Sequence, residues 1–449
     1  MTALLSGTVP GQLKSNEGRW PKICASTNAQ DMRIAMLCYH TSPLAQIGKS
    51  RDAGGMNVYV RELACHLGLM GVSVDIFTRW TDPMLPQVIS LSTRVRVIHI
   101  PAGPIENLHK NLLPQYLEQF ADGVNCFAVS HRRDYHIIHS HYWQSAAAGQ
   151  LLAMRWGAPH IVMFHTLADI KLMHRPEEHE TALRKQTEKE LIHTANAIIA
   201  AAPDEYHHLK FHYHAPEHTL HIIPCGVDMR KFYDRNREED KAAILQRLQL
   251  DDIPTLLFVG RLDPLKGADL AIQAAAKLPR CVNLLLIGGH PEDPERSRLT
   301  QAAQELGIAS TTRFIDAQPH DVMTRYYHAG DLFLVASYYE SFGLAAIEAL
   351  ASGTPVVAFR VGGLPSFIRH GVNGALAEQR NAVTFAEQIA NLLENPANMQ
   401  RTRNNARSSI AEYSWQNISF KMLALYRQLT ENSRFVIDTI SPAAQACIR

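Results

Sequence analysis

The sequence predicts an α/β protein built of two Rossmann-like, doubly wound domains that face each other across a cleft. Its 449 residues exceed one ordinary core and suit two domains of roughly 150–200 residues each. Short apolar runs alternate with segments of helical spacing, which is typical of βαβ units with right-handed crossovers. This alternation ends near residue 224 and then begins again, so the pattern occurs twice along the chain.

The first half opens with an apolar run over residues 33–39, of the kind that is buried in a parallel sheet. A glycine-bearing loop and a predicted helix over 56–70 follow, and residues 72–78 form the next strand. Further strands are expected over 95–100, 135–140, 160–164, 197–201 and 219–223.

The second half repeats the alternation with a strand over 255–259, a helix over 268–278 and a strand over 283–287. Three more strands are expected over 313–315, 332–335 and 355–358. The predicted organisation is an N-terminal extension (1–31), a first domain (32–224), a second domain (225–413), an amphipathic helix that crosses back to the first domain (414–430) and a tail (431–449).

Composition excludes several classes of protein. Lys plus Arg number 44 and Asp plus Glu 43, so no global basic field favours nucleic acid or an anionic membrane. The seven cysteines form no CxxC pair, which favours reduced thiols. No run of about 18 apolar residues occurs, and the first 31 residues lack the pattern of a secretory signal. We expect a cytoplasmic protein without a transmembrane segment or nucleic-acid partner; a homodimer stays open.

Two cations follow the first strand of the second half. Arg261 and Lys266 belong to the loop GRLDPLKG, between the strand over 255–259 and the next helix. A forked Arg and a point-charge Lys can together bind a diphosphate, and a helix start adds N–H groups and the positive end of the dipole. The alternative, from this stretch alone, is a pair of solvated surface cations.

A second motif, ESFGLAAIE, follows the strand over 332–335. Glu340 is placed at the carboxyl end of that strand, where open α/β sheets bind ligands. Ser341, Phe342 and Gly343 are expected to begin the helix and to offer N–H groups without intrahelical partners. A carboxylate beside such donors suits the hydroxyls of a sugar, and Glu348 could accept from a ribose hydroxyl pair. The alternatives are a helix cap for Glu340 and a solvated Glu348.

Other patterns are weak or absent. Gly54-Gly55 before the first helix would let the backbone approach a phosphate. GxGxxG is missing, and no acidic residue ends the second strand, which argues against a nicotinamide enzyme. No Asp-x-Asp follows an apolar strand, so no metal-bridged diphosphate site is indicated. Four histidines are better explained as the polar face of a surface helix than as metal ligands: His207, His208, His212 and His214.

Taken together, these motifs resemble glycosyltransferase family 4. Glu340 and Glu348 match its E-x7-E motif, GRLDPLKG its diphosphate clamp and CGVD (225–228) its interdomain joint, and the resemblance runs from about residue 32 to about residue 430. It implies the GT-B fold and retention of anomeric configuration. It also implies a nucleotide diphosphate sugar as co-substrate, with no other cofactor and no metal.

Within that family, HTSPL (40–44), GGMNVY (54–59) and HSHYW (139–143) are similar to inositol-3-phosphate N-acetylglucosaminyltransferases. That similarity implies catalytic roles for His165, Arg261, Lys266 and Glu340. It implies a donor, UDP-N-acetylglucosamine or UDP-glucose, held by Gly55, Arg261, Lys266, Glu340, Ser341, Phe342, Gly343 and Glu348. A small phosphorylated acceptor such as inositol 3-phosphate would contact His40, Asn57, Lys110, Tyr142, Thr166 and Arg184.

The sequence departs from those relatives in the loop 48–53, at Gln318 near the donor base, and over 173–180. Three alternatives therefore stay open. The first is a sucrose-phosphate synthase, which joins glucose to fructose 6-phosphate. The second is a lipid-linked mannosyltransferase, and the third is a non-catalytic sugar-nucleotide sensor. No candidate nucleophile favours double displacement, so we expect front-face attack through an oxocarbenium-like state.

Overall fold

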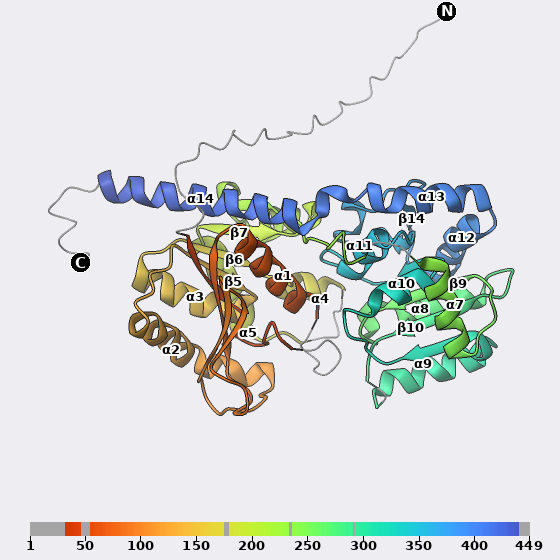
Figure 1. Ribbon diagram of the computed structural model, residues 1–449, viewed down its shortest axis with the longest axis horizontal. Coiled ribbons are helices and arrows are strands. Elements are labelled where there is room, and N and C mark those ends of the chain that lie inside the picture. The colour runs from red at the N-terminus through yellow and green to blue at the C-terminus, as the bar shows by residue number, and fades with distance from the viewer. Residues whose placement is uncertain (1–31, 46–53, 175–178, 233–235, 291, 440–449) are drawn as a thin grey trace, which may run out of the picture.

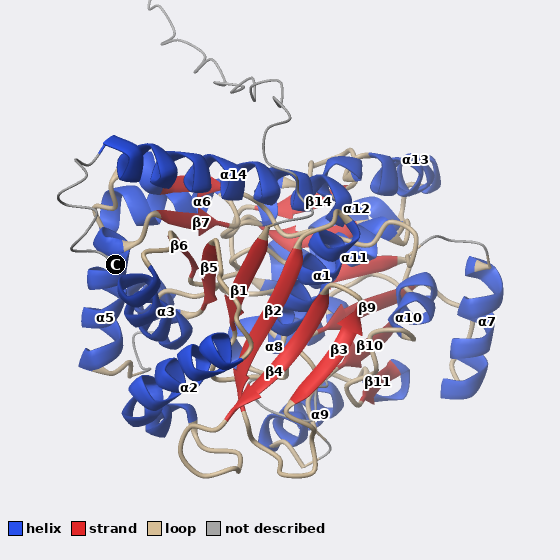
Figure 2. Cartoon of the chain, turned by 60° about the vertical axis from the view of Figure 1, so that its left-hand side comes forward, coloured by secondary structure: helices blue, strands red, loops and turns tan. Residues whose placement is uncertain are grey.

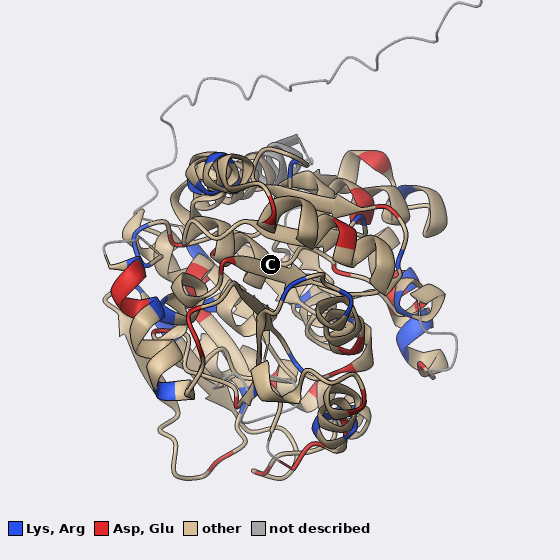
Figure 3. Cartoon of the chain, turned by 90° about the vertical axis from the view of Figure 1, so that its right-hand side faces the viewer, with Lys and Arg blue, Asp and Glu red and all other residues tan. Residues whose placement is uncertain are grey.

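A computed structural model describes residues 32–45, 54–174, 179–232, 236–290 and 292–439 of the chain. The predictions for residues 1–31, for the loop 48–53, for the middle of 173–180 and for the end of the tail lie outside these ranges. Each half contains a sheet with helices packed around it (Figure 1). Basic and acidic residues are interspersed along the elements visible in Figure 3 rather than gathered by sign.

The first domain is built on an eight-stranded sheet with the order β3-β4-β2-β1-β5-β6-β7-β8. All neighbouring pairs are parallel except β3 with β4 (Figure 2). The strands are β1 (Arg33–Leu37), β2 (Ser73–Arg79), β3 (Val88–Ser92), β4 (Val95–Ile100), β5 (Ile137–His141), β6 (His160–Met163), β7 (Ala197–Ala200) and β8 (Leu220–Ile222).

Helices cover both faces of this sheet. Ile34 and Met36 of β1 pack in the same cluster as Leu63 of α1, whereas Ala35 and Leu37 pack with α2 and α3 on the other face. Because helices cover both faces of the sheet, its central strands are continuous apolar runs in the sequence. The helices are α1 (Gly55–Leu69), η2 (Lys110–Tyr116), α2 (Leu117–Ser130), α3 (Trp143–Trp156), α4 (Ala168–His174), α5 (Ala182–Thr194), α6 (Pro203–His207), the π-helix η3 (His208–His212) and η4 (Glu217–Thr219).

The second domain contains a six-stranded parallel sheet with the order β11-β10-β9-β12-β13-β14. Its strands are β9 (Thr255–Val259), β10 (Asn283–Ile287), β11 (Thr312–Ile315), β12 (Leu332–Val335), β13 (Val356–Phe359) and β14 (Gly374–Ala377). Its α-helices are α7 (Arg237–Leu248), α8 (Ala268–Ala276), α9 (Pro294–Glu305), α10 (Met323–Ala329), α11 (Leu344–Ala351), α12 (Ala382–Leu393) and α13 (Pro396–Ser408). Short 3₁₀ turns complete it: η5 (Pro264–Lys266), η6 (Ala309–Thr311), η7 (Leu364–Ser366) and η8 (Ala411–Tyr413).

The chain passes between the domains at two adjacent places. Val227 donates its N–H to the Tyr413 carbonyl at 2.8 Å, and its own carbonyl accepts from the Trp415 N–H at 3.2 Å, so the two crossings lie side by side. A Cβ on Gly226 would lie 2.4 Å from the Trp415 ring, which leaves no room for a side chain there. After the second crossing, α14 (Trp415–Thr439) runs along the first domain (Figure 1).

Three features differ from the sequence-based expectations. Strand β3 was not expected; it is a partly exposed antiparallel edge strand rather than a buried run. Strand β14 (GALA) was also missed, because it has no β-branched residue. Residues 341–343 do not begin a helix: α11 starts at Leu344, and Gly343 precedes it with φ +102°. Among the described residues, none of the helices is both long and apolar enough to cross a membrane.

Candidate active site

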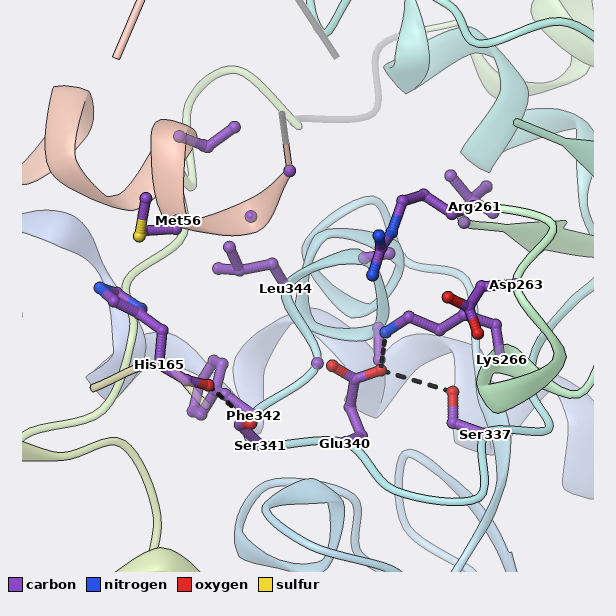
Figure 4. A pocket seen from close by; sticks show the side chains of 18 of the residues that line it. Met56, His165, Arg261, Asp263, Lys266, Ser337, Glu340, Ser341, Phe342 and Leu344 are labelled. Carbon is purple, nitrogen blue, oxygen red and sulfur yellow. Dashed lines mark hydrogen bonds and ion pairs between the residues drawn. The ribbon is translucent and has the colours of Figure 1, made fainter. Parts of the chain in front are cut away.

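A cavity of about 660 Å³ opens between the two domains. It lies beyond the carboxyl ends of β1, β5 and β6 on one side and of β9, β10 and β12 on the other, the usual ligand position in open α/β sheets. Every site residue predicted from the sequence except Asn57 lines it. Figure 4 shows the second-domain wall, where Arg261 and Lys266 point toward the region of Glu340.

The loop after β9 carries Arg261 and Lys266. The Asp263 carboxylate accepts from the Leu265 N–H at 2.9 Å and so fixes the first turn of η5. Gly267 then takes φ +68°, and a Cβ there would lie 2.0 Å from the Ala336 carbonyl oxygen. Only glycine fits that approach, and it directs Lys266 into the cavity. Its Nζ lies 2.6 Å from Glu340 Oε2. The motifs GRLDPLKG and ESFGLAAIE are therefore joined by an ion pair.

Glu340 is held by its backbone as well as by Lys266. Its carbonyl accepts from the Gly363 N–H at 2.8 Å, and Gly362, with φ +51°, approaches so closely that a Cβ would lie 2.0 Å from that oxygen. Ser337 Oγ lies 3.4 Å from Glu340 Oε2. Glu340 therefore makes contacts into the cavity and is not a cap of α11.

Residues 341–343 join the two walls. Ser341 donates its hydroxyl to the His165 carbonyl of the first domain at 2.9 Å (Figure 4). Phe342 is buried against Phe367 and Tyr413. These residues precede α11, so its N-terminus and positive dipole end face the cavity.

Glu348 is buried rather than solvated, with 8% of its surface exposed. Its Oε1 lies 2.7 Å from His320 Nε2, and its Oε2 accepts from the Tyr327 hydroxyl at 2.7 Å. Burial and the nearby carboxylate raise the pKa of Tyr327 well above its ordinary value, so the phenol stays a donor. Neither partner was identified from sequence, because both lie more than twenty residues away and follow no motif.

On the first-domain wall, Gly55 begins α1 opposite α11. A Cβ on Gly55 would lie 2.9 Å from Leu344 Cδ1, so a side chain here would push against the second domain. Asn57 lies behind this wall: its side chain accepts from the Gly54 N–H and donates to Thr41 Oγ1 and the Ser42 carbonyl. The structure thus places Asn57 as a support of the glycine loop and not in the cavity lining.

Arg184 is the most buried cation of the cavity wall, with 3% exposure. Its Nε lies 2.7 Å from Glu188 Oε1, another nitrogen donates to the Thr166 carbonyl at 3.0 Å, and its guanidinium lies 5.1 Å from the Tyr142 ring centre. Lys110, at the start of η2, reaches the same cavity. Three of the predicted acceptor residues therefore converge around Arg184.

Two charged residues that sequence analysis missed join this cluster. Lys171 also lines the cavity, and its Nζ donates to Glu180 at 2.8 Å. Glu180 lies 3.0 Å from Arg184 as well, with only 10% of its side chain exposed. Burial alone would raise the pKa of Glu180, but the charges of Arg184 and Lys171 outweigh it and lower that pKa. Glu180 belongs to the segment 173–180, which sequence analysis singled out as a departure from the resemblance.

His165 and His40 are neutral bases at the cavity. Burial lowers the pKa of each to about 3, and the cations Lys110 and Arg184 add to this for His40. His165 has φ +60°, and its Nε2 lies 3.1 Å from His141 Nδ1. Tyr142, whose ring lies 4.3 Å from His40, has φ +75°. Left-handed backbone at two non-glycine residues of one cavity is strain of the kind that functional sites retain.

The histidines of the surface segment do not gather at a metal site. Among the described residues, no group of three or more His, Cys, Asp or Glu side chains is arranged to hold a metal ion. The segment is α6 followed by the π-helix η3, in which His208 Nε2 lies 3.6 Å from Asp204 Oδ2 and His212 Nε2 lies 3.7 Å from Asp169 Oδ2.

Comparison with known proteins agrees with this geometry. The family models Glycosyltransferase Family 4 and Glycosyl transferases group 1 match residues 53–231 and 240–409. The chain is 37% identical to D-inositol 3-phosphate glycosyltransferase of Corynebacterium diphtheriae, covering 88% of this chain and 94% of the relative. It is 39% identical to the enzyme of that name from Mycobacterium marinum, covering 88% and 85%.

Among solved structures, sucrose-phosphate synthase from Thermosynechococcus elongatus is 32% identical with a TM-score of 0.81, covering 89% of this chain and 100% of that one. The lipopolysaccharide glycosyltransferase WaaG shares the fold alone, at 17% identity and a TM-score of 0.66, covering 88% and 99%. Fold, motif positions and relatives agree: the chain is a glycosyltransferase with the GT-B fold and belongs to glycosyltransferase family 4.

Proposed function

We propose that this glycosyltransferase transfers a sugar, with retention, from a nucleotide diphosphate donor to a small phosphorylated acceptor. The donor is UDP-N-acetylglucosamine or UDP-glucose, and inositol 3-phosphate is the first candidate acceptor, in line with the names of the relatives at 37% and 39% identity. One observation carries the proposal: a single cavity has a cation pair on its second-domain wall and a separate cation cluster on its first-domain wall. Two anionic groups can bind there at once, one on each substrate.

The donor lies along the second-domain wall. Arg261 and Lys266 bind the diphosphate, assisted by the α11 N-terminus and by Gly55 from the other side. Glu348 accepts from the ribose hydroxyls, and Glu340 with Ser341–Gly343 holds the transferred sugar. When the diphosphate arrives, Lys266 shares its charge between Glu340 and the phosphate oxygens, since an ammonium has three donors.

The acceptor lies along the first-domain wall. Its phosphate binds among Lys110, Tyr142, Thr166 and Arg184, and Lys171 adds a cation to that set. His40 lies beside Tyr142 and contacts the acceptor ring, while Asn57 acts indirectly by fixing the loop at Gly54.

Transfer follows a front-face course. The bond between the sugar anomeric carbon and the diphosphate oxygen breaks, the acceptor hydroxyl oxygen bonds to that carbon on the same face, and the departing phosphate oxygen takes the hydroxyl proton. Arg261 and Lys266 stabilise the charge that develops on the leaving diphosphate. Among the described first-domain residues that line the cavity there is no carboxylate, which supports this course over double displacement.

His165 contributes as a neutral group near the reacting carbon. Because its pKa is about 3, it carries no positive charge that would oppose an oxocarbenium-like state. Ser341 fixes the His165 carbonyl across the cleft, so this residue keeps its position relative to the sugar-binding loop. We further propose a cytoplasmic location, supported by the free thiols of the described cysteines, Cys38, Cys65, Cys126, Cys225 and Cys281.

Sucrose-phosphate synthase activity is the second candidate, and the solved structure at 32% identity with a TM-score of 0.81 supports it. Both activities need a phosphate pocket for the acceptor, so the same cation cluster serves either. They differ in the acceptor ring and in the transferred sugar.

The experiment is a matrix of initial rates. UDP-, GDP- and ADP-sugars are combined with inositol 3-phosphate or fructose 6-phosphate, each with and without EDTA. We expect turnover of UDP-N-acetylglucosamine with inositol 3-phosphate at a rate that EDTA leaves unchanged. UDP-glucose with fructose 6-phosphate would assign the sucrose branch. Loss of activity in EDTA, restored by Mg²⁺, would contradict the metal-independent clamp, and an inverted product would contradict the front-face course.

A further inference from the structure

A chain of three side chains leads from the interdomain joint to the cavity. Lys231 Nζ lies 2.7 Å from His320 Nδ1, and His320 Nε2 lies 2.7 Å from Glu348 Oε1. Lys231 follows the joint by a few residues, His320 precedes α10, and Glu348 lies on α11. Three segments that are distant in sequence therefore meet at one carboxylate.

The hydrogen bonds fix the tautomer of His320. A lysine ammonium can only donate, so Nδ1 of His320 must be an acceptor without a proton. The ring proton then resides on Nε2 and is donated to Glu348 Oε1. Tyr327 donates to Oε2, so each oxygen of Glu348 accepts one protein hydrogen bond. A carboxylate oxygen can accept two, which leaves one position on each oxygen for a ligand hydroxyl.

Packing holds this arrangement in place. The Phe232 side chain is fully buried, and its ring meets those of His320 and Tyr327 edge-on, with centroids 5.7 and 5.8 Å apart. Asp228 of the joint accepts from the Lys231 N–H at 3.0 Å, and Thr324 donates to the Lys231 carbonyl at 3.3 Å. The backbone of Lys231 is thus tied both to the joint and to α10.

We propose that Lys231 and His320 are positioning residues that orient Glu348 to accept two adjacent hydroxyls, those of the donor ribose. Lys231 selects the Nε2–H tautomer of His320, and His320 with Tyr327 sets the plane of the carboxylate. This inference rests on the proposed function, because it assigns to Glu348 the ribose of a nucleoside diphosphate. It predicts that Lys231 and His320 contribute to the discrimination of ribose from 2′-deoxyribose by acting on Glu348.

The experiment measures that discrimination by calorimetry. UDP and 2′-deoxy-UDP are titrated into wild type, Glu348→Gln, His320→Phe, His320→Gln, Lys231→Met and Lys231→Arg; if wild type binds ADP or GDP instead, the matching deoxy pair is used. A hydrogen bond to a charged group corresponds to about tenfold or more in affinity. Wild type should prefer UDP at least about tenfold. Glu348→Gln and His320→Phe should remove most of that preference, by weakening UDP binding more than 2′-deoxy-UDP binding, since the deoxy ligand keeps only the 3′-hydroxyl for Glu348 to accept from.

Conservative variants separate positioning from mere folding. A glutamine at 320 can present an amide N–H near the place of Nε2–H, so His320→Gln should keep most of the preference, and Lys231→Arg should keep more than Lys231→Met. Lys241→Met is the matched control, because Lys241 is a half-buried lysine of the same domain that pairs with Asp331 outside the cavity. It should leave the ratio unchanged.

The possible failures are distinguishable. If Glu348→Gln removes the ribose preference but His320→Phe and Lys231→Met keep it, the positioning role is refuted and the proposed function stands. Equal weakening of UDP and 2′-deoxy-UDP in His320→Phe would also refute positioning, since general damage to the site affects both ligands. If wild type binds no nucleoside diphosphate, the proposed function fails and the inference fails with it.

Discussion

Replacing Glu180 by glutamine should strengthen binding of a phosphorylated acceptor. Glu180 pairs with Lys171 at 2.8 Å and Arg184 at 3.0 Å, so its carboxylate competes with an acceptor phosphate for the same two cations. Glu188 neutralises Arg184 from its other side at 2.7 Å. The substitution Glu180→Gln is nearly isosteric and removes one negative charge without removing the side chain.

The magnitude follows from the charges of the cluster. Lys110, Lys171 and Arg184 supply three positive charges, and Glu180 with Glu188 offsets two of them. A phosphate that shares the cations with Glu180 would lie roughly 4 Å from it, where two unit charges interact by about 4 kcal/mol at an effective dielectric constant of about 20. Screening by solvent reduces this gain, and so does the loss of the ion pair with Glu180 that holds Lys171 in place. We expect a net effect of about 1.4 kcal/mol, which is about a tenfold lower KM for the acceptor.

The assay is initial rate against acceptor concentration at saturating donor. KM for inositol 3-phosphate should fall about tenfold in Glu180→Gln with kcat little changed, and inorganic phosphate should become a stronger competitive inhibitor. Glu190→Gln is the control, because Glu190 is exposed on α5, the helix that follows Glu180, and its carboxylate accepts from Gln186 at 2.9 Å. An unchanged or higher KM in Glu180→Gln would refute the reasoning and would mean that Glu180 orders the cations rather than competing for them.

Three further predictions concern catalysis and stability. Lys266→Ala should lower kcat by about 10²–10³-fold, whereas Lys277→Ala, at an exposed lysine, should leave kcat unchanged. A near-normal kcat in Lys266→Ala would contradict the role of Lys266 in binding the diphosphate. Gly267→Ala should lower the free energy of unfolding by about 2–4 kcal/mol, because its Cβ would lie 2.0 Å from a carbonyl oxygen. Gly353→Ala has a similar φ but open space, so it should cost about 1 kcal/mol, and equal urea midpoints for the two would contradict this. Finally, burial lowers the pKa of His160 to about 3. Below about pH 6.5 the unfolded chain therefore binds a proton at this histidine that the folded chain does not bind. The free energy of unfolding consequently decreases as the pH falls. His160→Gln should reduce the stability lost between pH 7.5 and 5.5 by about 1.4 kcal/mol; parallel pH profiles would argue against it.

Much of the fold was predictable because its strands are buried on both faces. Residues 255–259, 283–287 and 332–335 form strands with the expected bounds, since a continuous apolar run between turn residues has few other interpretations. Edge strand β3 was missed because two of its five residues are exposed and the other three are only partly buried. The motif residues Arg261, Lys266, Glu340 and Glu348 converge because parallel strands end at one edge of the sheet.

The residues that act on those side chains were not predictable. Glu180 precedes α5 and contacts Arg184 and Lys171 without belonging to any sequence motif, and His320 reaches Glu348 from a loop 28 residues away. Asn57 was expected at the cavity, yet its polar atoms bind neighbouring backbone and Thr41 instead. Sequence patterns report which strand end a residue follows; they do not report which partner takes its hydrogen bonds.

The path of α14 sets the order in which the molecule can be completed during synthesis. Trp415 packs edge-on against Tyr59 of α1, and the Tyr426 hydroxyl lies 2.7 Å from His139 Nδ1 in the first sheet. Both partners leave the ribosome long before these residues, because chains emerge from the N-terminus. The nascent first domain must therefore wait, with this part of its apolar surface uncovered, until nearly the whole second domain has been made.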